Sequence, residues 1–198
     1  LINKADFISC SQQSYVRQYD LLAGLKKGGT FLLNTFWSDE ELNTHLPASM
    51  RRYIASNDIQ FYTVDAVHIA RELGLGGRFN MVMQSAFFKL ANIIPIDDAV
   101  KYLKDAVVTS YGSKGEKVVN MNNGAIDHGI ESLHRVNVPA EWKDAVDEEV
   151  PVNTKTPEFI TKIQNVMNRQ EGDKLKISEL LSMEDGTFPV GGTAFEKR

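Results

Sequence analysis

Apolar residues are densest in the segment 74–95, whose sequence is GLGGRFNMVMQSAFFKLANIIP. If residues 80–94 form a helix, apolar side chains occupy most of its circumference, and Ser85, Lys89 and Asn92 lie on one narrow polar stripe. A helix that is apolar on so many sides is expected to be buried on several of them. About fifteen residues are too few to cross a bilayer, which takes roughly 20. The segment therefore predicts a central helix of a folded domain.

The polar stripe on this helix has two interpretations. Lys89 can reach solvent along its aliphatic stem while the rest of the helix is buried. Alternatively, the stripe faces a partner domain, where its polar groups would need hydrogen-bond partners.

Upstream of this helix, short apolar runs alternate with amphipathic stretches. The apolar runs at Ala5–Cys10, Thr30–Asn34 and Ile59–Val64 are typical of strands covered on both faces. Helices are predicted at Tyr15–Leu25, from the capping box Ser38–Glu41 onward, and at Ala66–Leu73. Strands and helices that alternate in this way form a parallel sheet with helices on both sides. The predicted fold class is therefore α/β, a three-layer α/β/α arrangement with a mostly parallel, Rossmann-like sheet.

The C-terminal half is predicted to be rich in helices and to end in an extended tail. Beyond the central helix, helical patterns cover residues 97–111 and 116–135, with Gly124 and Gly129 allowing a close approach of a neighbouring helix. From residue 139 onward the pattern thins into charged and proline-bearing segments. We therefore expect one domain at 1–138, followed by a linker-like region at 139–198 with too little apolar mass for a core of its own.

Charge and cysteine content exclude several classes of protein. The 22 basic and 26 acidic residues give a net charge of −4 without a basic run, which argues against a nucleic-acid-binding protein. The single cysteine, Cys10, excludes a disulfide framework and is typical of a reducing compartment, so a cytoplasmic location is expected. Neither a signal peptide nor a membrane span is predicted. Both ends of the sequence suggest a segment of a longer polypeptide.

The sequence contains no recognisable catalytic set. Paired carboxylates, a Ser/His/Asp set and a P-loop are all missing, and Cys10 has no nominated base, so a buried apolar role is expected for it. No histidine has a partner at metal-ligand spacing, which holds for His45, His68, His128 and His134. We therefore expect neither catalytic residues nor metal ligands in this chain.

The glycine-rich turn before the central helix is a candidate anion site. Residues 74–77 invite comparison with a GxGxxG dinucleotide fingerprint, but they follow a helix and lack the third glycine. The backbone amides around Arg78 and the start of the helix at Asn80 could instead hold an anion. The alternative is a tight turn whose arginine pairs with a neighbouring domain.

Several long motifs resemble one family. The sequences KGGTFLLN at 27–34 with Trp37, GRFNMVMQ at 77–84, AFFKLA at 86–91 and VPAEW at 138–142 resemble the gamma domain of pyruvate:ferredoxin (flavodoxin) oxidoreductase. The tail from DGTFP at 185–189 to EKR at 196–198 resembles the EKR segment that follows that domain. The resemblance covers nearly the whole chain in the expected order. It assigns 1–138 to an N-terminally truncated gamma domain and 139–198 to the EKR segment, which leads toward a ferredoxin-like domain.

The resemblance implies a part of a large cytoplasmic enzyme of anaerobic metabolism. Such enzymes decarboxylate pyruvate oxidatively to acetyl-CoA and CO2, using thiamine diphosphate, Mg and iron–sulfur clusters, and pass electrons to ferredoxin or flavodoxin. The full enzyme is expected to be a homodimer, and its thiamine and cluster domains would lie outside this segment. The gamma domain is expected to support coenzyme A binding and to pack against the other domains of the enzyme.

The resemblance also directs attention to particular residues. The family's gamma domain begins with a glycine-rich strand–turn–helix and a lysine-bearing segment, both upstream of these residues. This chain is therefore expected to carry only part of the coenzyme A site and to lack one or more strands of its sheet. The candidate ligand-binding residues lie at strand carboxyl ends and in the anion-competent turn: Ser11, Gln12, Asn34, Trp37, Arg78 and Asn80. Arg78 is expected to meet either a phosphate of coenzyme A or an acidic side chain of an adjoining domain.

Three other functions remain open from the sequence. The enzyme could act on another 2-oxoacid with ferredoxin as acceptor. The chain could be an independent nucleotide-binding enzyme, although the phosphate fingerprint is missing. It could also be a structural docking domain that orders its neighbours without binding a ligand.

Overall fold

The structure is a computed structural model that describes residues 4–147, 156–169, 171–181, 183, 185–190 and 192–195. These residues form two compact units. The first, here called the sheet unit, contains residues 4–16 and 21–147, and the second, the tail unit, contains residues 17–20 and the described residues from 156 onward.

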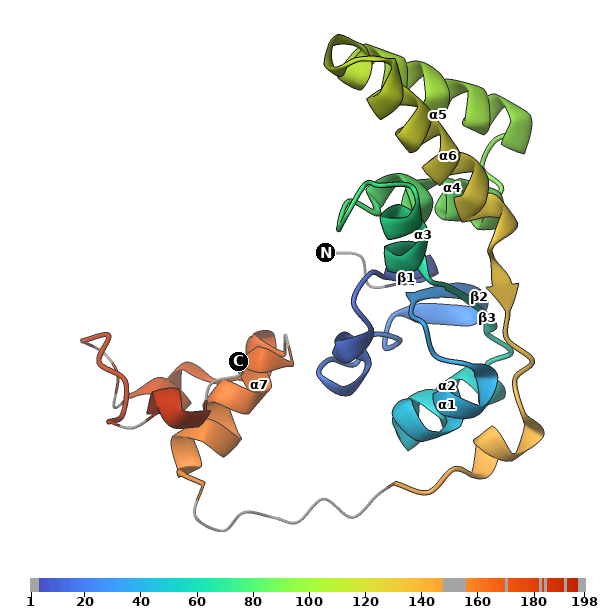
Figure 1. The fold of residues 1–198 in the computed structure, drawn as a ribbon. Helices are drawn as coiled ribbons and strands as arrows, with labels where there is room; N and C mark the ends of the chain where they lie inside the picture. Colours follow the sequence, from blue (N-terminus) through green and yellow to red (C-terminus); the bar gives the residue numbers. More distant parts are fainter. Residues whose placement is uncertain are drawn as a thin grey trace. The chain divides into compact units, whose positions relative to one another are not determined.

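The sheet unit is built on a four-stranded, mostly parallel sheet with the strand order β1-β2-β3-β4 (Figure 1). The strands are β1 (Ala5–Cys10), β2 (Leu25–Asn34), β3 (Gln60–Val64) and β4 (His134–Arg135). The first three strands are parallel, whereas β4 pairs antiparallel with β3.

Helices cover both faces of this sheet. Helices α1 (Asp39–His45) and α2 (Ala48–Ser56) lie on one face, and α3 (Ala66–Glu72) and α4 (Asn80–Ala91) lie on the other (Figure 1). The remaining elements of the unit are η1 (Gln13–Arg17), α5 (Ile96–Tyr111), η2 (Gly112–Lys114), α6 (Glu116–Glu131) and η3 (Ala140–Asp144). The predicted three-layer α/β/α class is confirmed.

The core consists of two layers separated by the sheet. Phe31 and Leu33 of β2 pack into the layer beneath α1 and α2, where Trp142 is also buried. Leu32, which points to the opposite face, packs with Val82 of α4 in the other layer. Because successive side chains of a strand alternate between faces, a strand covered on both sides must be apolar at every position. This explains the uninterrupted apolar run in the sequence.

The predicted helix at Tyr15–Leu25 is wrong. A short 3-10 helix covers only Gln13–Arg17, and β2 begins at Leu25, five residues earlier than the predicted strand. The early part of β2 pairs irregularly with β1, because the register shifts between Ala5 and Phe7. Gly28 has a φ of 73°, which residues with a side chain rarely adopt, so the glycine pair accommodates the bulge in this part of β2.

The predicted central helix does pack on several sides, against β2, α3, α5 and α6, but its side chains are less buried than predicted. Only Val82, Ser85 and Ala86 of α4 are buried, and most of its other apolar side chains are partly exposed. Asn92 does not continue the helix, since its φ of 46° places it in the left-handed region as the C-cap. The three polar residues therefore serve different purposes: Ser85 is buried, Lys89 is exposed and Asn92 ends the helix.

Helix α6 packs closely against α4. A Cβ atom added to Gly129 would lie 2.5 Å from the Val82 carbonyl oxygen and 2.3 Å from the Ser85 hydroxyl oxygen. The predicted close approach at Gly129 is confirmed.

Helix α6 ends at Glu131, before the predicted end at 135, and His134 and Arg135 instead form β4. An ion pair between Lys104 and Asp127, 2.7 Å apart, joins α5 to α6.

The tail unit consists of short helical turns. These are the π-helical turn η4 (Ile160–Gln164), α7 (Asn165–Asn168), η5 (Gly172–Lys174), η6 (Ile177–Leu180) and η7 (Gly192–Phe195). Among the described residues of this unit, Ile160 is the one buried hydrophobic residue. In the part of the chain that the structure describes, no helix combines the length and the apolar character needed to cross a membrane.

Candidate functional site

A cleft of about 340 Å³ lies where β1, β2 and β3 end. Because the three strands are parallel, the residues that follow them meet at one edge of the sheet, which is where α/β folds bind ligands. Ten residues line this strand-end cleft: Ser11, Gln12, Gln13, Asn34, Thr35, Phe36, Asp65, Val67, His68 and Arg71.

The side chain of Asn34 links segments that line the cleft by two hydrogen bonds. Its side-chain Nδ2 donates to the backbone oxygen of Ser11 at 3.0 Å, and its Oδ1 accepts from the backbone N–H of Ala66 at 2.9 Å. The amide is buried, so both interactions are protected from water. One side chain thus connects the end of β1, the end of β2 and the start of α3.

Thr35 fixes the loop that follows β2. Its backbone N–H donates to the Val64 carbonyl oxygen at 3.0 Å, and its hydroxyl donates to Gln13 Oε1 at 2.7 Å. The same hydroxyl oxygen accepts from the backbone N–H of Trp37 at 3.1 Å. The Trp37 ring stacks on His45 with a centroid distance of 4.5 Å.

Helix α3 brings a cation to the rim of the cleft. Asp65 caps this helix by accepting from the backbone N–H of His68, whose ring lies 3.2 Å from the Glu72 carboxylate. Arg71 is exposed, and its guanidinium has neither a hydrogen-bond nor an ion-pair partner among the described residues. The rim therefore carries a positive charge that is free to meet an anionic ligand.

Cys10 is the last residue of β1 and directly precedes the lining residue Ser11. Its side chain is buried and its Sγ donates to the Gln12 carbonyl oxygen at 3.2 Å. Burial raises the pKa of the Cys10 thiol above its ordinary value, and the hydrogen bond to Gln12 only partly offsets this effect. The predicted buried role of this residue is confirmed.

The structure brings three of the six predicted site residues together. Ser11, Gln12 and Asn34 line the cleft, and Trp37 lies one residue beyond its lining residue Phe36. The other two, Arg78 and Asn80, are exposed at the start of α4 and do not line the cleft. The Nε of Arg78 donates to the Leu75 carbonyl oxygen at 3.0 Å.

Sequence reasoning missed Phe36 and Arg71 as lining residues. Both residues come after the carboxyl end of a strand, Phe36 after β2 and Arg71 on the helix after β3, but this position alone did not identify them. A phenylalanine directly after an apolar strand is expected to join the core. Nothing in the sequence pattern distinguished Arg71 from the other basic residues on helix surfaces.

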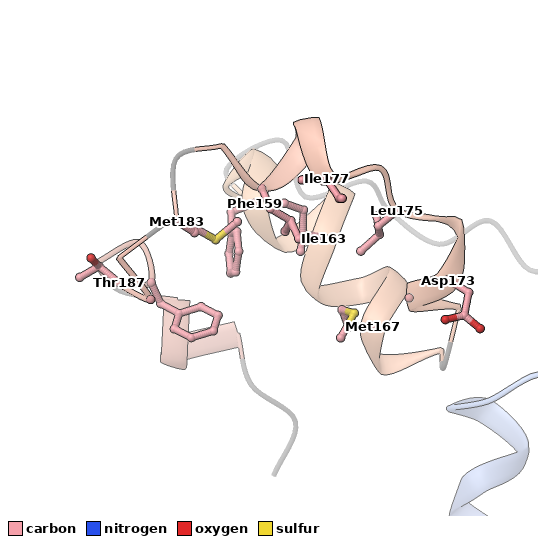
Figure 2. A pocket seen from close by; sticks show the side chains of 12 residues that line it. Phe159, Ile163, Met167, Asp173, Leu175, Ile177, Met183 and Thr187 are labelled. Carbon is pink, nitrogen blue, oxygen red and sulfur yellow. The ribbon is translucent and has the colours of Figure 1, made fainter.

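The tail unit contains a larger cavity, of about 540 Å³, with a different character. Figure 2 shows Phe159, Ile163 and Met167 along one wall, with Leu175, Ile177 and Met183 also lining the cavity. Asp173 is the one charged residue in its lining. The strand-end cleft is therefore the better candidate for a charged, polar ligand.

Comparison with known proteins identifies two matching regions. Residues 1–132 match the family model described as pyruvate ferredoxin/flavodoxin oxidoreductase, and residues 145–198 match the EKR model, described as a domain of unknown function. The predicted boundary between 138 and 139 falls in the interval between the two matches and remains a prediction.

The chain is similar along its whole length to three curated enzymes. It is 62% identical to pyruvate-flavodoxin oxidoreductase of Enterobacter agglomerans, 59% identical to that of Klebsiella pneumoniae, and 52% identical to pyruvate:ferredoxin oxidoreductase of Moorella thermoacetica. All 198 residues align in each case, and they span 17% of the length of each relative.

A solved structure has the same fold. Pyruvate oxidoreductase subunit PORC from Thermotoga maritima matches with a TM-score of 0.54 and 18% identity, over 68% of this chain and 66% of that one. This likeness supports the α/β architecture. The family model's match over residues 1–132, which is more than half of the chain, shows that the chain belongs to the pyruvate ferredoxin/flavodoxin oxidoreductase family.

Proposed function

We propose that this chain supports coenzyme A binding, at the strand-end cleft, in an enzyme that oxidatively decarboxylates pyruvate to acetyl-CoA and CO2. The electrons pass to ferredoxin or flavodoxin, and the segment also packs against other domains of the same, homodimeric enzyme. Family membership and the names of the relatives support the reaction. Another 2-oxoacid remains the alternative substrate, because the described residues include no group assigned to substrate recognition.

The observation that carries the proposal is the unpaired Arg71 guanidinium at the rim of a polar cleft. Coenzyme A carries phosphate groups, and charge-assisted hydrogen bonds from guanidinium to phosphate are among the stronger polar interactions. Gln12 and Ser11 add side chains that can accept and donate hydrogen bonds. The cleft thus combines a cation with neutral polar groups, which suits a phosphate-bearing ligand, and its one carboxylate, Asp65, is engaged as the N-cap of α3.

The redox cofactors of the enzyme would be held by other domains. Among the described residues, no group of three or more His, Cys, Asp or Glu side chains could hold a metal ion. The sequence also contains one cysteine, whereas iron–sulfur clusters of the common types use four. We therefore assign the clusters, and thiamine diphosphate with Mg, to other domains of the enzyme, and to this segment a role in binding and positioning.

The test is a calorimetric titration of the intact enzyme with coenzyme A. Arg71→Ala is expected to weaken binding by about 5- to 10-fold, the cost of one charge-assisted hydrogen bond at an exposed site. Lys101→Ala, an exposed cation on α5, is the matched control and should leave the affinity unchanged. Equal affinities for the Arg71 variant and the native enzyme would remove the cleft from the coenzyme site.

Arg78 is the second candidate phosphate contact and is tested by kinetics. Its Nε is engaged by Leu75, but the side chain is exposed and no partner of its terminal nitrogens is seen among the described residues. Arg78→Ala should raise the apparent KM for coenzyme A if it binds phosphate. An unchanged KM with lowered thermal stability would leave only a structural role.

A docking function without a ligand is the second candidate, and α5 favours it. This helix exposes Tyr102 and Val108, with relative exposures of 62% and 54%, and Ile93 just before it is 66% exposed. Replacing Tyr102 and Val108 by serine should lower the thermal stability of the intact enzyme if this surface packs against another domain. The affinity for coenzyme A should then be unaffected.

A further inference from the structure

Phe36 is an exposed aromatic residue two positions after the end of β2. Phe31, Leu32 and Leu33 are fully buried, and Asn34 and Thr35 are 5% exposed, but the Phe36 ring is 67% exposed. Exposing a large aromatic side chain forfeits the free energy that its burial would contribute. Phe36 nevertheless lines the strand-end cleft together with Arg71 and Gln12.

The backbone on both sides of Phe36 is anchored. Thr35 is held by Val64 and Gln13, and the Trp37 N–H donates to the Thr35 hydroxyl oxygen. Trp37 is fixed in turn by its ring, which stacks on His45 at an interplanar angle of 15°. The exposed ring therefore stands on a short, well-defined segment, and little ordering is needed for a ligand to use it.

The groups around Phe36 differ in chemistry and together match one type of ligand. An aromatic face stacks on the flat π-surface of a nucleobase. The Gln12 carboxamide, which has no side-chain partner among the described residues, offers both a donor and an acceptor to a base edge. The unpaired guanidinium of Arg71 suits a phosphate.

We infer that Phe36 is the platform on which the adenine ring of the coenzyme stacks, with Arg71 binding phosphate, so that the strand-end cleft recognises the nucleotide half of coenzyme A. This inference rests on the proposed function and adds to it a specificity-determining residue. It also assigns the pantetheine arm, with its reactive thiol, to a position outside the cleft.

The experiment uses the full-length oxidoreductase and two ligands, coenzyme A and adenosine 3′,5′-bisphosphate, which represents the nucleotide half alone. Phe36→Ala should weaken the binding of both by about tenfold, because a lost base-stacking contact has an effect of that order. Phe36→Trp, which keeps an aromatic face, should bind both ligands about as tightly as the native enzyme.

The outcomes separate this inference from the proposed function. If Arg71→Ala weakens coenzyme A binding but Phe36→Ala does not, the cleft binds the coenzyme and the stacking role is wrong. If neither variant changes the affinity, both proposals fail. If Phe36→Ala lowers the melting temperature of the enzyme with unchanged affinity for both ligands, Phe36 is a contact to another domain and the inference is overturned.

Discussion

The side chain of Asn34 donates a hydrogen bond from its Nδ2 to the backbone oxygen of Ser11, 23 residues earlier in the chain, at 3.0 Å. This bond crosses from the end of β2 to the loop after β1, and the same side chain accepts from the backbone N–H of Ala66. A single buried amide thus joins three of the segments that form the strand-end cleft.

Asn34→Asp should distort the cleft and lower stability. Aspartate can still accept from Ala66, but it has no donor for Ser11 and places a second oxygen against that carbonyl group. The expected loss is about 1–3 kcal/mol, which corresponds to a decrease in melting temperature of roughly 2–4 °C for each kcal/mol. Calorimetric melting of the residue 1–198 segment measures it.

Thr109→Ala is the matched control for this substitution. Thr109 also donates a side-chain hydrogen bond to a backbone oxygen, that of Asp105, but it lies on the exposed surface of α5. Removing it should change stability by less than about 0.5 kcal/mol. Equal melting temperatures for the two variants would show that the Asn34 amide does not hold the cleft.

Gly129→Ala should destabilise the packing of α6 on α4. Alanine is favoured over glycine in a helix by about 1 kcal/mol, but the added Cβ would lie 2.5 Å from the Val82 carbonyl oxygen. That oxygen belongs to the backbone of α4, so the two helices must move apart, and overpacking of this kind costs about 1–3 kcal/mol. Urea unfolding should show a net loss of stability.

Gly124→Ala on the same helix provides the contrast. Its added Cβ would meet only the side chain of Leu73, whose Cδ2 and Cδ1 atoms would lie 3.2 and 3.7 Å away, and a leucine side chain can yield by a rotation. The gain in helix propensity should then dominate, so this variant is expected to be at least as stable as the native chain. The opposite order of the two variants would contradict the packing described for α6.

Trp142→Ala should be among the most destabilising single substitutions. The indole is buried in the layer beneath α1 and α2, its ring centroid is 6.4 Å from that of Phe61, and its Nε1 donates to Asn43 Oδ1. Truncation of a buried tryptophan costs about 3–5 kcal/mol. The exposed Val146 gives the control, because Val146→Ala should leave the urea midpoint unchanged.

The apolar pattern predicted the sheet but not the first crossover. Residues 30–34 and 59–64 are apolar because both faces of β2 and β3 are covered, and that pattern is local and unambiguous. Val16, Tyr19 and Leu22 also recur every three residues, as on one face of a helix. Val16 and Leu22 nevertheless reach the core from a 3-10 turn and a loop. Periodicity alone does not distinguish these alternatives.

The site was predictable as far as it depends on topology. Parallel strands end at one edge, which was enough to select Ser11, Gln12 and Asn34. Phe36 could not be selected in this way, because a phenylalanine after an apolar strand is expected to join the core. Its exposure follows from the anchoring of Thr35 by Gln13, a contact between residues 22 positions apart. The burial of α4 was overestimated, because the composition of a helix does not show how much of its surface is covered by residues of the same chain.

Cys10 should resist alkylation in the folded protein. The buried thiol has a raised pKa, so it stays protonated at neutral pH, and only the thiolate reacts. As the pH rises, the thiol of the unfolded chain ionises before that of the folded chain. The contribution of Cys10 to the free energy of unfolding is therefore complete below the ordinary pKa of 9.0 and is lost as the pH rises through the folded pKa. Mass spectrometry of the Cys10 peptide after iodoacetamide treatment at pH 8 should show modification only when denaturant is present. Rapid modification of the native protein would mean that the thiol is accessible or ionised.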